Sequence, residues 1–183
     1  MGRVQLFYKN LSEIVGSRGF SVVTLTDAEE KRSLNVVCDK AITQQFKLRI
    51  NQVPGHEMML PEVLLKIFEK DGVGDMELLV YDIVDGQYQT SLLNKRSLVI
   101  KTIRMSDAIL LHFLSKIPLY IDDNLMARQS APYQPETCSF SVPINSIDTK
   151  RLNEELEKAI AAEDYRLASY LHHELQKRQK PKE

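Results

Sequence analysis

One dipeptide constrains the fold of this chain more than any other short feature. Asp85-Gly86 stands between residues 77–84 (ELLVYDIV) and residues 87–93 (QYQTSLL), two runs with strand-like composition. Asp-Gly favours a tight two-residue turn, whose twist matches that of two antiparallel strands. The sequence therefore predicts a β-hairpin, and residues 97–104 (SLVIKTIR) follow as a third strand of the same sheet.

Further strands and helices are predicted on both sides of this hairpin. Strands are indicated by β-branched and apolar runs, and helices by apolar spacing with capping residues. The predicted strands lie at 20–26, 32–38 and 117–121, and the predicted helices at 39–51, 61–71 and 106–116. Asp39 is the expected cap of the first of these helices. We therefore expect an α+β domain over residues 1–126, with a mainly antiparallel sheet and its helices packed on one face.

Two of these helices carry more specific expectations. In the helix at 106–116, Ser106 is expected to be the N-cap, and Asp107 to complement the helix dipole in the first turn. The apolar side chains of the helix at 61–71 are expected to be buried, and they are Val63, Leu64, Ile67 and Phe68.

The composition changes after residue 126. Residues 127–149 contain Pro132, Pro135 and Pro143 among many Ser, Thr and Gln residues, which predicts a linker or an irregular arm. Residues 150–183 then carry two short amphipathic helices, with Asp164 as the expected N-cap of the second. Because helices this short are marginal alone, the helical hairpin is expected to be stabilised by a partner, its own dimer or the preceding domain.

This helical hairpin resembles a known motif. Its spacing over residues 152–175 is Leu-x-x-x-Leu, Ala-Ile, Glu-Asp-Tyr-x-x-Ala and Leu-x-x-Glu-Leu. It is similar to the UVR motif, the hairpin of nucleotide-excision-repair subunits and of some chaperone and kinase-activator proteins. His172-His173 stand where the motif usually has Arg-Asp, and the alternative is a generic helical hairpin. The resemblance implies a protein partner that binds apolar residues, namely Leu156, Ile160, Tyr165 and Leu171.

Composition excludes several other classes of protein. The formal net charge of −1 gives no general attraction to nucleic acid, so such binding needs a local basic patch. There is no apolar run of about 18 residues, so we expect no membrane span. The first residues lack the apolar core of a signal peptide, which favours a cytoplasmic protein. Cys38 and Cys138 are too few and too far apart to form a metal motif, and we expect both to stay reduced.

The domain at 1–126 has a resemblance of its own. Residues 104–109 (RMSDAI), followed by a helix and by 117–121 (IPLYI), are similar to the Arg-Pro-Ser-Asp-Ala-Ile pattern of the bifunctional nuclease family. These are small α+β proteins, also described as DNase/RNase domains, and the combination with a UVR hairpin is seen among them. The resemblance covers about residues 20–126. Met105 replaces Pro, and residues 60–62 (LPE) replace Thr-His-Asp, so only Glu62 persists there; His56 is a nearby substitute outside the family pattern.

The resemblance implies metal-dependent cleavage of DNA or RNA. Mg²⁺ or Mn²⁺ would be held by Asp107 and Glu62, since such ions prefer oxygen ligands. Arg104 would face a phosphate through its planar guanidinium, and Ser106 would lie beside it at the helix N-terminus. The structural alternatives are helix capping by Ser106 and Asp107 and an ion pair of Arg104 with a nearby acid.

A second function of another class stays open at this point. The domain would be catalytically inactive, and a dimeric binding or adaptor protein would recruit a repair or proteostasis partner through the helical hairpin. The missing Thr-His pair and the mild net charge favour this alternative. In either case a homodimer is expected, because symmetric dimers are the commonest soluble oligomers.

Overall fold

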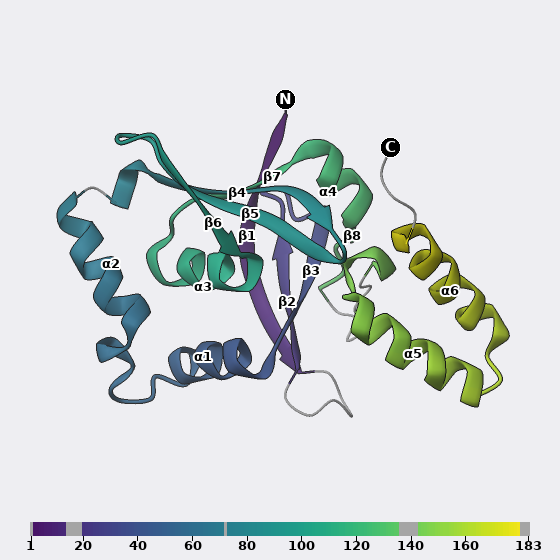
Figure 1. Ribbon diagram of the computed structural model, residues 1–183. Helices are drawn as coiled ribbons and strands as arrows, with labels where there is room; N and C mark the ends of the chain where they lie inside the picture. The colour runs from purple at the N-terminus through teal and green to yellow at the C-terminus, as the bar shows by residue number, and fades with distance from the viewer. Residues whose placement is uncertain (1, 14–19, 72, 136–142, 180–183) are drawn as a thin grey trace. The chain divides into compact units, whose positions relative to one another are not determined.

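The computed structural model describes residues 2–13, 20–71, 73–135 and 143–179, and its strands form an eight-stranded sheet (Figure 1). The strands are β1 (Arg3–Glu13), β2 (Ser21–Thr26), β3 (Arg32–Cys38), β4 (Met76–Val84), β5 (Gln87–Asn94), β6 (Val99–Arg104), β7 (Leu119–Asp122) and β8 (Ala131–Pro132). Their order in the sheet is β6-β5-β4-β7-β1-β2-β3-β8. The β4–β7 pairing is parallel, whereas β1–β2, β1–β7, β2–β3, β3–β8 and β5–β6 are antiparallel.

Six α-helices accompany the sheet in the described residues. They are α1 (Lys40–Ile50), α2 (Leu60–Asp71), α3 (Met105–Ser115), α4 (Asp123–Gln129), α5 (Thr149–Ala161) and α6 (Tyr165–Gln179). Three short 3₁₀ helices also occur, namely η1 (His56–Met58), η2 (Val73–Asp75) and η3 (Ile144–Ser146). The predicted α+β class, with a mainly antiparallel sheet and a C-terminal helical hairpin, is confirmed.

Helix α3 is central to the packing of the first domain, because it contacts β1, β6 and β7 as well as α1 and α2 (Figure 1). Three aromatic rings join these elements. Phe113 of α3 lies edge-on to Tyr8 of β1 and to Phe46 of α1, with ring centroids 4.8 and 5.5 Å apart. Such edge-to-face pairs add to the burial of apolar area. This contact fixes α1 and α3 next to each other, which places their N-terminal ends for the site described below.

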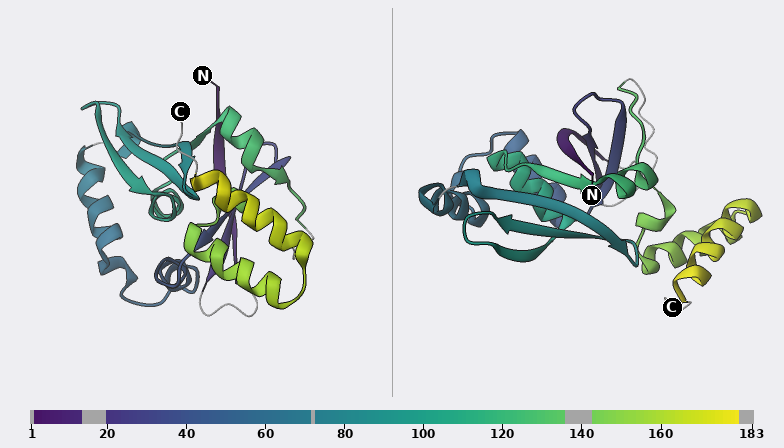
Figure 2. Two further views of the ribbon diagram at one scale, coloured as in Figure 1. Left: turned by 45° about the vertical axis from the view of Figure 1, so that its right-hand side comes forward. Right: turned by 90° about the horizontal axis from the view of Figure 1, so that it is seen from above.

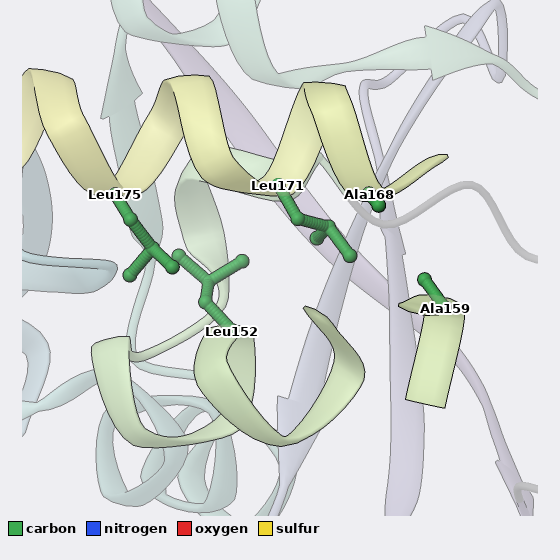
Figure 3. Packing of buried hydrophobic residues seen from close by; sticks show 5 residues of the cluster. All are labelled: Leu152, Ala159, Ala168, Leu171 and Leu175. Carbon is green, nitrogen blue, oxygen red and sulfur yellow. The ribbon is translucent and has the colours of Figure 1, made fainter. Parts of the chain in front are cut away.

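The chain forms two compact units, Met1–Asp82 with Gln89–Ser141 and Ile83–Tyr88 with Val142–Glu183. Within the second unit, α5 and α6 lie side by side (Figure 2). Their facing sides bury a cluster of small and branched apolar residues, namely Leu152, Ala159, Ala168, Leu171 and Leu175 (Figure 3). Asp164 Oδ1 accepts a hydrogen bond from Leu167 N at 3.0 Å, so its predicted role as N-cap of α6 is confirmed.

Several local predictions differ from the structure. Strand β1 was not predicted, because a register shift between Tyr8 and Asn10 interrupts its two-residue periodicity. Regular structure also continues past residue 126, through the rest of α4 and into β8.

The predicted burial of the apolar side of α2 is wrong for Val63, Leu64 and Ile67, which are exposed. Among the described side chains of this helix, Leu65 is the buried apolar one. The side chain of Phe68 lies outside the described residues. The reason for the difference is that the contacts of α2 with α3, η1 and η2 leave these three side chains exposed.

Candidate functional site

The end of β6 and the start of α3 bring together one arginine and two carboxylates. Arg104 Nε lies 2.7 Å from Asp107 Oδ2, and Nη2 lies 3.2 Å from Oδ1, which is a bidentate ion pair. The Arg104 Nη1 atom also lies 3.8 Å from Asp39 Oδ2. Asp39 is the N-cap of α1, where its Oδ1 accepts a hydrogen bond from Ile42 N at 2.9 Å. We refer to Asp39, Arg104 and Asp107 as the acid–arginine cluster.

This cluster is open to solvent. The side chain of Arg104 is 66% exposed, and both carboxylates are partly exposed beside it. The hydrogen bond and the charge of Asp107 raise the pKa of Arg104, so its guanidinium stays cationic. The cluster therefore combines one planar cation with two acids. Because the carboxylates outnumber the cation, a phosphate could bind Arg104 here only if a further cation offset their charge.

Cys38 lies beside the cluster but is not a nucleophile. Burial raises the pKa of its thiol to about 12, and the charges of Asp39 and Asp107 add to this shift. A thiol at this pKa stays protonated at neutral pH, and the thiolate is the reactive form.

Ser106 does not cap α3, so that prediction is wrong. The helix begins at Met105, its N-cap is Arg104, and no side chain makes the capping hydrogen bond. Ser106 instead lies partly buried in the first turn, between Arg104 and Asp107 in sequence. The N-cap lies two residues before the predicted position, because strand β6 passes into α3 without a connecting loop.

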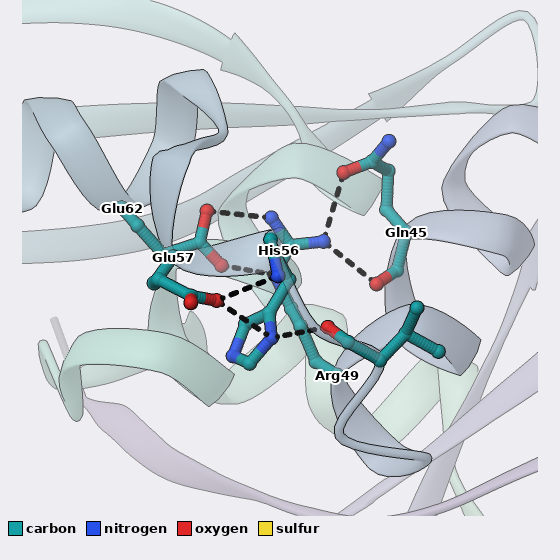
Figure 4. A network of polar contacts seen from close by, with 7 residues as sticks. Gln45, Arg49, His56, Glu57 and Glu62 are labelled. Carbon is teal, nitrogen blue, oxygen red and sulfur yellow. Dashed lines mark hydrogen bonds and ion pairs between the residues drawn. The ribbon is translucent and has the colours of Figure 1, made fainter.

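Glu62 lies in a different set of contacts, on α2 (Figure 4). Its two carboxylate oxygens accept hydrogen bonds from Arg49 Nε and Nη2 at 2.6 and 2.7 Å. Arg49 Nη1 also donates to the backbone oxygen and to Oε1 of Gln45, at 2.7 and 2.8 Å. Nearby, the ring of His56 is hydrogen-bonded through Nδ1 to Val53 O at 2.8 Å. Glu62 is therefore part of a buried ion pair between α1 and α2.

The two residues predicted to hold a metal thus have separate partners, Arg104 for Asp107 and Arg49 for Glu62. Across the described ranges, no group of three or more His, Cys, Asp and Glu side chains could hold a metal ion. Asp39 is the member of the cluster that sequence reasoning treated only as a helix cap. In the sequence, Asp39 is an acid that directly follows a predicted strand, and this position indicates a helix cap. It does not indicate a contact with Arg104, which lies 65 positions further along the chain.

The four residues predicted to bind a partner fall into two groups. Leu171 is buried in the cluster between α5 and α6, and Leu156 packs against that cluster. Ile160 and Tyr165 are exposed. Leu167 and Tyr170 of α6 are exposed as well, and they lie off the apolar face that the periodicity defines.

Comparison with known proteins assigns the first domain to a family. The profile of the bifunctional nuclease domain matches residues 23–134, which is more than half of the chain. The protein therefore belongs to the bifunctional nuclease domain family. The matched range includes Asp39, Glu62, Arg104 and Asp107, and it ends before α5. A search of curated proteins gives no match. Among the described helices, none is both long and apolar enough to cross a membrane.

Proposed function

We propose that this protein hydrolyses phosphodiester bonds of DNA or RNA at the acid–arginine cluster. The observation that carries the proposal is the exposed guanidinium of Arg104, which two carboxylates flank within the domain matched to the nuclease family. Hydrolysis of a phosphodiester needs positive charge on the phosphate and a group that activates or orients water. Arg104 has the chemistry of the first role, and Asp39 and Asp107 have that of the second.

Arg104 binds the substrate in this proposal. Its planar fork of N–H groups matches two oxygens of a phosphate as well as it matches a carboxylate. Since the side chain is mostly exposed, it can exchange its contact with Asp107 for one with a phosphate. That exchange leaves Asp107 free to accept a proton from water or to bind a cation.

The oxygen ligands of Asp39 and Asp107 are of the type that a divalent cation, Mg²⁺ or Mn²⁺, prefers. Magnesium is commonly held by one or two carboxylates together with waters and substrate phosphates, so a cage of three protein ligands is not required. Asp107 and Asp39 would hold it, and Glu62 would not, because both of its oxygens accept hydrogen bonds from Arg49. When bound, such a cation lowers the pKa of a water and neutralises charge on the phosphate.

The test is a nuclease assay on the purified full chain with single- and double-stranded DNA and RNA, in Mg²⁺, in Mn²⁺ and in EDTA. Arg104→Ala and Asp107→Asn should each lower the rate by about 100-fold or more, the effect of losing one preorganised charge contact. Asp123→Asn is the matched control, because Asp123 is an exposed acid in the first turn of α4. If both cluster variants are as active as the unaltered protein, the activity comes from a contaminating nuclease. If the unaltered protein cleaves no substrate with any metal, the proposal is refuted.

A second function is favoured by the surface of the helical hairpin. Its inner side is closed by the cluster around Leu152 and Leu171, yet Ile160, Tyr165 and Tyr170 stay exposed. Aromatic residues at an exposed site are enriched in protein interfaces. We infer that this UVR-like hairpin binds a protein partner through these residues, whether or not the first domain is catalytic.

This second function is tested by partner capture with the full chain. Ile160→Glu with Tyr165→Glu should abolish capture, and so should deletion of residues 150–183. Ser169→Glu, at another exposed position of α6, should leave capture unchanged. A set of partners that is the same for all three variants would contradict a docking role for the hairpin.

A further inference from the structure

One segment of the first unit carries only positive charge. Residues 94–104 (NKRSLVIKTIR) form the end of β5, the turn after it and β6, and they contain four cations and no acid. The four are Lys95, Arg96, Lys101 and Arg104. All of them are exposed, in a chain whose formal net charge is −1. Binding of nucleic acid by such a chain needs a local basic patch, and this segment has the composition of one.

The cations at the two ends of the segment already have acidic partners. Lys95 Nζ lies 2.8 Å from Glu77 Oε2, and Arg104 belongs to the acid–arginine cluster. The two cations between them differ, because no ion pair among the described residues includes Arg96 or Lys101. Their charges are therefore available to a ligand.

Strand β6 presents its cations on an edge of the sheet. It lies at one end of the strand order, and β5 is its paired strand in the ranges that the structure describes (Figure 1). Because successive side chains of a strand alternate, Lys101 and Arg104 point to opposite faces and are about 10 Å apart along the strand. That is about one Debye length at 0.1 M salt, so both charges act on an anion that lies along the edge. The outward N–H groups of an edge strand are further donors to phosphate oxygens.

Leu98 gives an independent reason to expect a ligand here. It is 77% exposed and has a φ of 56°, in the left-handed region that a leucine rarely adopts. Val99 and Ile100 beside it are exposed as well. A strained backbone and a group of exposed apolar side chains both cost stability, and such features cluster where a ligand is bound.

We propose that residues 95–104, which we call the basic edge, bind a single strand of DNA or RNA with its phosphates along the exposed cations. The ligand is a nucleic acid because the segment combines a run of cations with exposed apolar side chains. It is single-stranded because unstacked bases expose flat apolar faces, which Leu98, Val99 and Ile100 can contact. In a duplex these faces are stacked on each other.

The basic edge ends at Arg104, so a bound strand reaches the acid–arginine cluster. Binding along this edge needs neither a metal nor cleavage, and it therefore goes beyond the proposed hydrolysis. The cations of the edge also add positive charge beside a cluster in which the carboxylates outnumber the arginine. A strand held by the basic edge does not depend on Arg104 alone.

The test is fluorescence anisotropy of the full chain in EDTA, with labelled thymidylate and uridylate strands of about 20 nucleotides, longer than one binding site, and with a duplex of the same length. The single strands should bind more tightly than the duplex. In Arg96→Gln with Lys101→Gln, the slope of log K against log salt should fall by about 1.4, since each phosphate contact of a single strand contributes about 0.7. At 0.1 M salt this corresponds to about 25-fold weaker binding.

Arg128→Gln with Lys177→Gln is the matched control, because it removes one arginine and one lysine at exposed positions of α4 and α6. Its salt slope should equal that of the unaltered protein. Equal slopes in the two double variants, no binding of any strand, or tighter binding of the duplex would overturn the proposal. Competition by a polyglutamate peptide as strong as that by the thymidylate strand would also overturn it, since the edge would then bind any polyanion.

Leu98→Gly tests the apolar part of the basic edge separately. Glycine adopts a positive φ without strain, so this variant should be about as stable as the unaltered protein in thermal denaturation. Its affinity for the single strands should still fall, with an unchanged salt slope, because no phosphate contact is lost. Unchanged affinity would contradict contact of Leu98 with the bases.

Binding and cleavage are measured separately, so the two proposals fail on different results. If the protein binds strands through the basic edge but cleaves none with any metal, hydrolysis is refuted and the basic edge stands. If the protein cleaves, but Arg96→Gln with Lys101→Gln binds as the unaltered protein does, the basic edge is refuted and hydrolysis stands.

Discussion

Replacing Glu62 by Gln distinguishes a structural role of this residue from a chemical one. The substitution keeps the shape of the side chain and removes the charge that Arg49 faces, at a guanidinium whose side chain is 2% exposed. Removal of one partner from a buried ion pair destabilises a protein by about 3–5 kcal/mol. Because Arg49 keeps its two hydrogen bonds to Gln45, we expect a loss of stability at the lower end of this range, about 3 kcal/mol. For a chain of this size, that corresponds to a fall in Tm of about 6–12 °C.

The assay is urea denaturation of the full chain, with a double-mutant cycle of Glu62→Leu and Arg49→Met. The double variant should be less destabilised than the sum of the two single variants, because neither charge is then left unpaired. Glu57→Gln is the control, since Glu57 is an exposed acid on η1. It contacts only Gly55 N and His56 at the surface, so this variant should lose far less stability than Glu62→Gln. Unchanged stability of Glu62→Gln together with lost nuclease activity would refute the structural reading of Glu62.

Two further predictions concern stability elsewhere in the chain. Burial lowers the pKa of His112 below its usual 6.5, and its ring is hydrogen-bonded to Ile117 O. As the pH falls, the unfolded chain therefore gains a proton at His112 before the folded chain does, so the free energy of unfolding should fall below about pH 6.5. Urea denaturation from pH 8 to pH 5 measures this dependence. In His112→Gln, the part of the pH dependence that comes from this histidine should be absent. Leu152→Ala should destabilise the helical hairpin by about 2–5 kcal/mol, seen as lost amide protection in α5 and α6, whereas Ile160→Ala should have little effect.

Features encoded within a few residues were predictable from the sequence. Both residues of Asp85-Gly86 have positive φ, 49° and 79°, as a tight hairpin turn requires. Strand β3 has the predicted bounds, and Asp39 caps α1 as its position before a helical pattern indicates. In each case the information lies in the local backbone preference of the residues themselves, so no tertiary contact is needed to find it.

Features that depend on contacts between distant segments were not predictable. Arg49 and Glu62 belong to different helices, and their pairing depends on how α1 and α2 are placed. The approach of Asp39 to Arg104 likewise depends on the contact between α1 and α3. The order of strands, with β1 between β7 and β2, is a property of the whole sheet. The sequence therefore indicated Arg104 and Asp107 as neighbours, whereas the approach of Asp39 to Arg104 is known only from the structure.

The measurement that tests the central claim most directly is a comparison of Asp39→Asn with Glu62→Gln in the nuclease assay. Both are run at a temperature where denaturation curves show each variant to be folded. If the chemistry occurs at the acid–arginine cluster, Asp39→Asn lowers the rate by about 100-fold, while Glu62→Gln keeps the rate of the unaltered protein. Full activity of Asp39→Asn together with an inactive, folded Glu62→Gln would contradict the account.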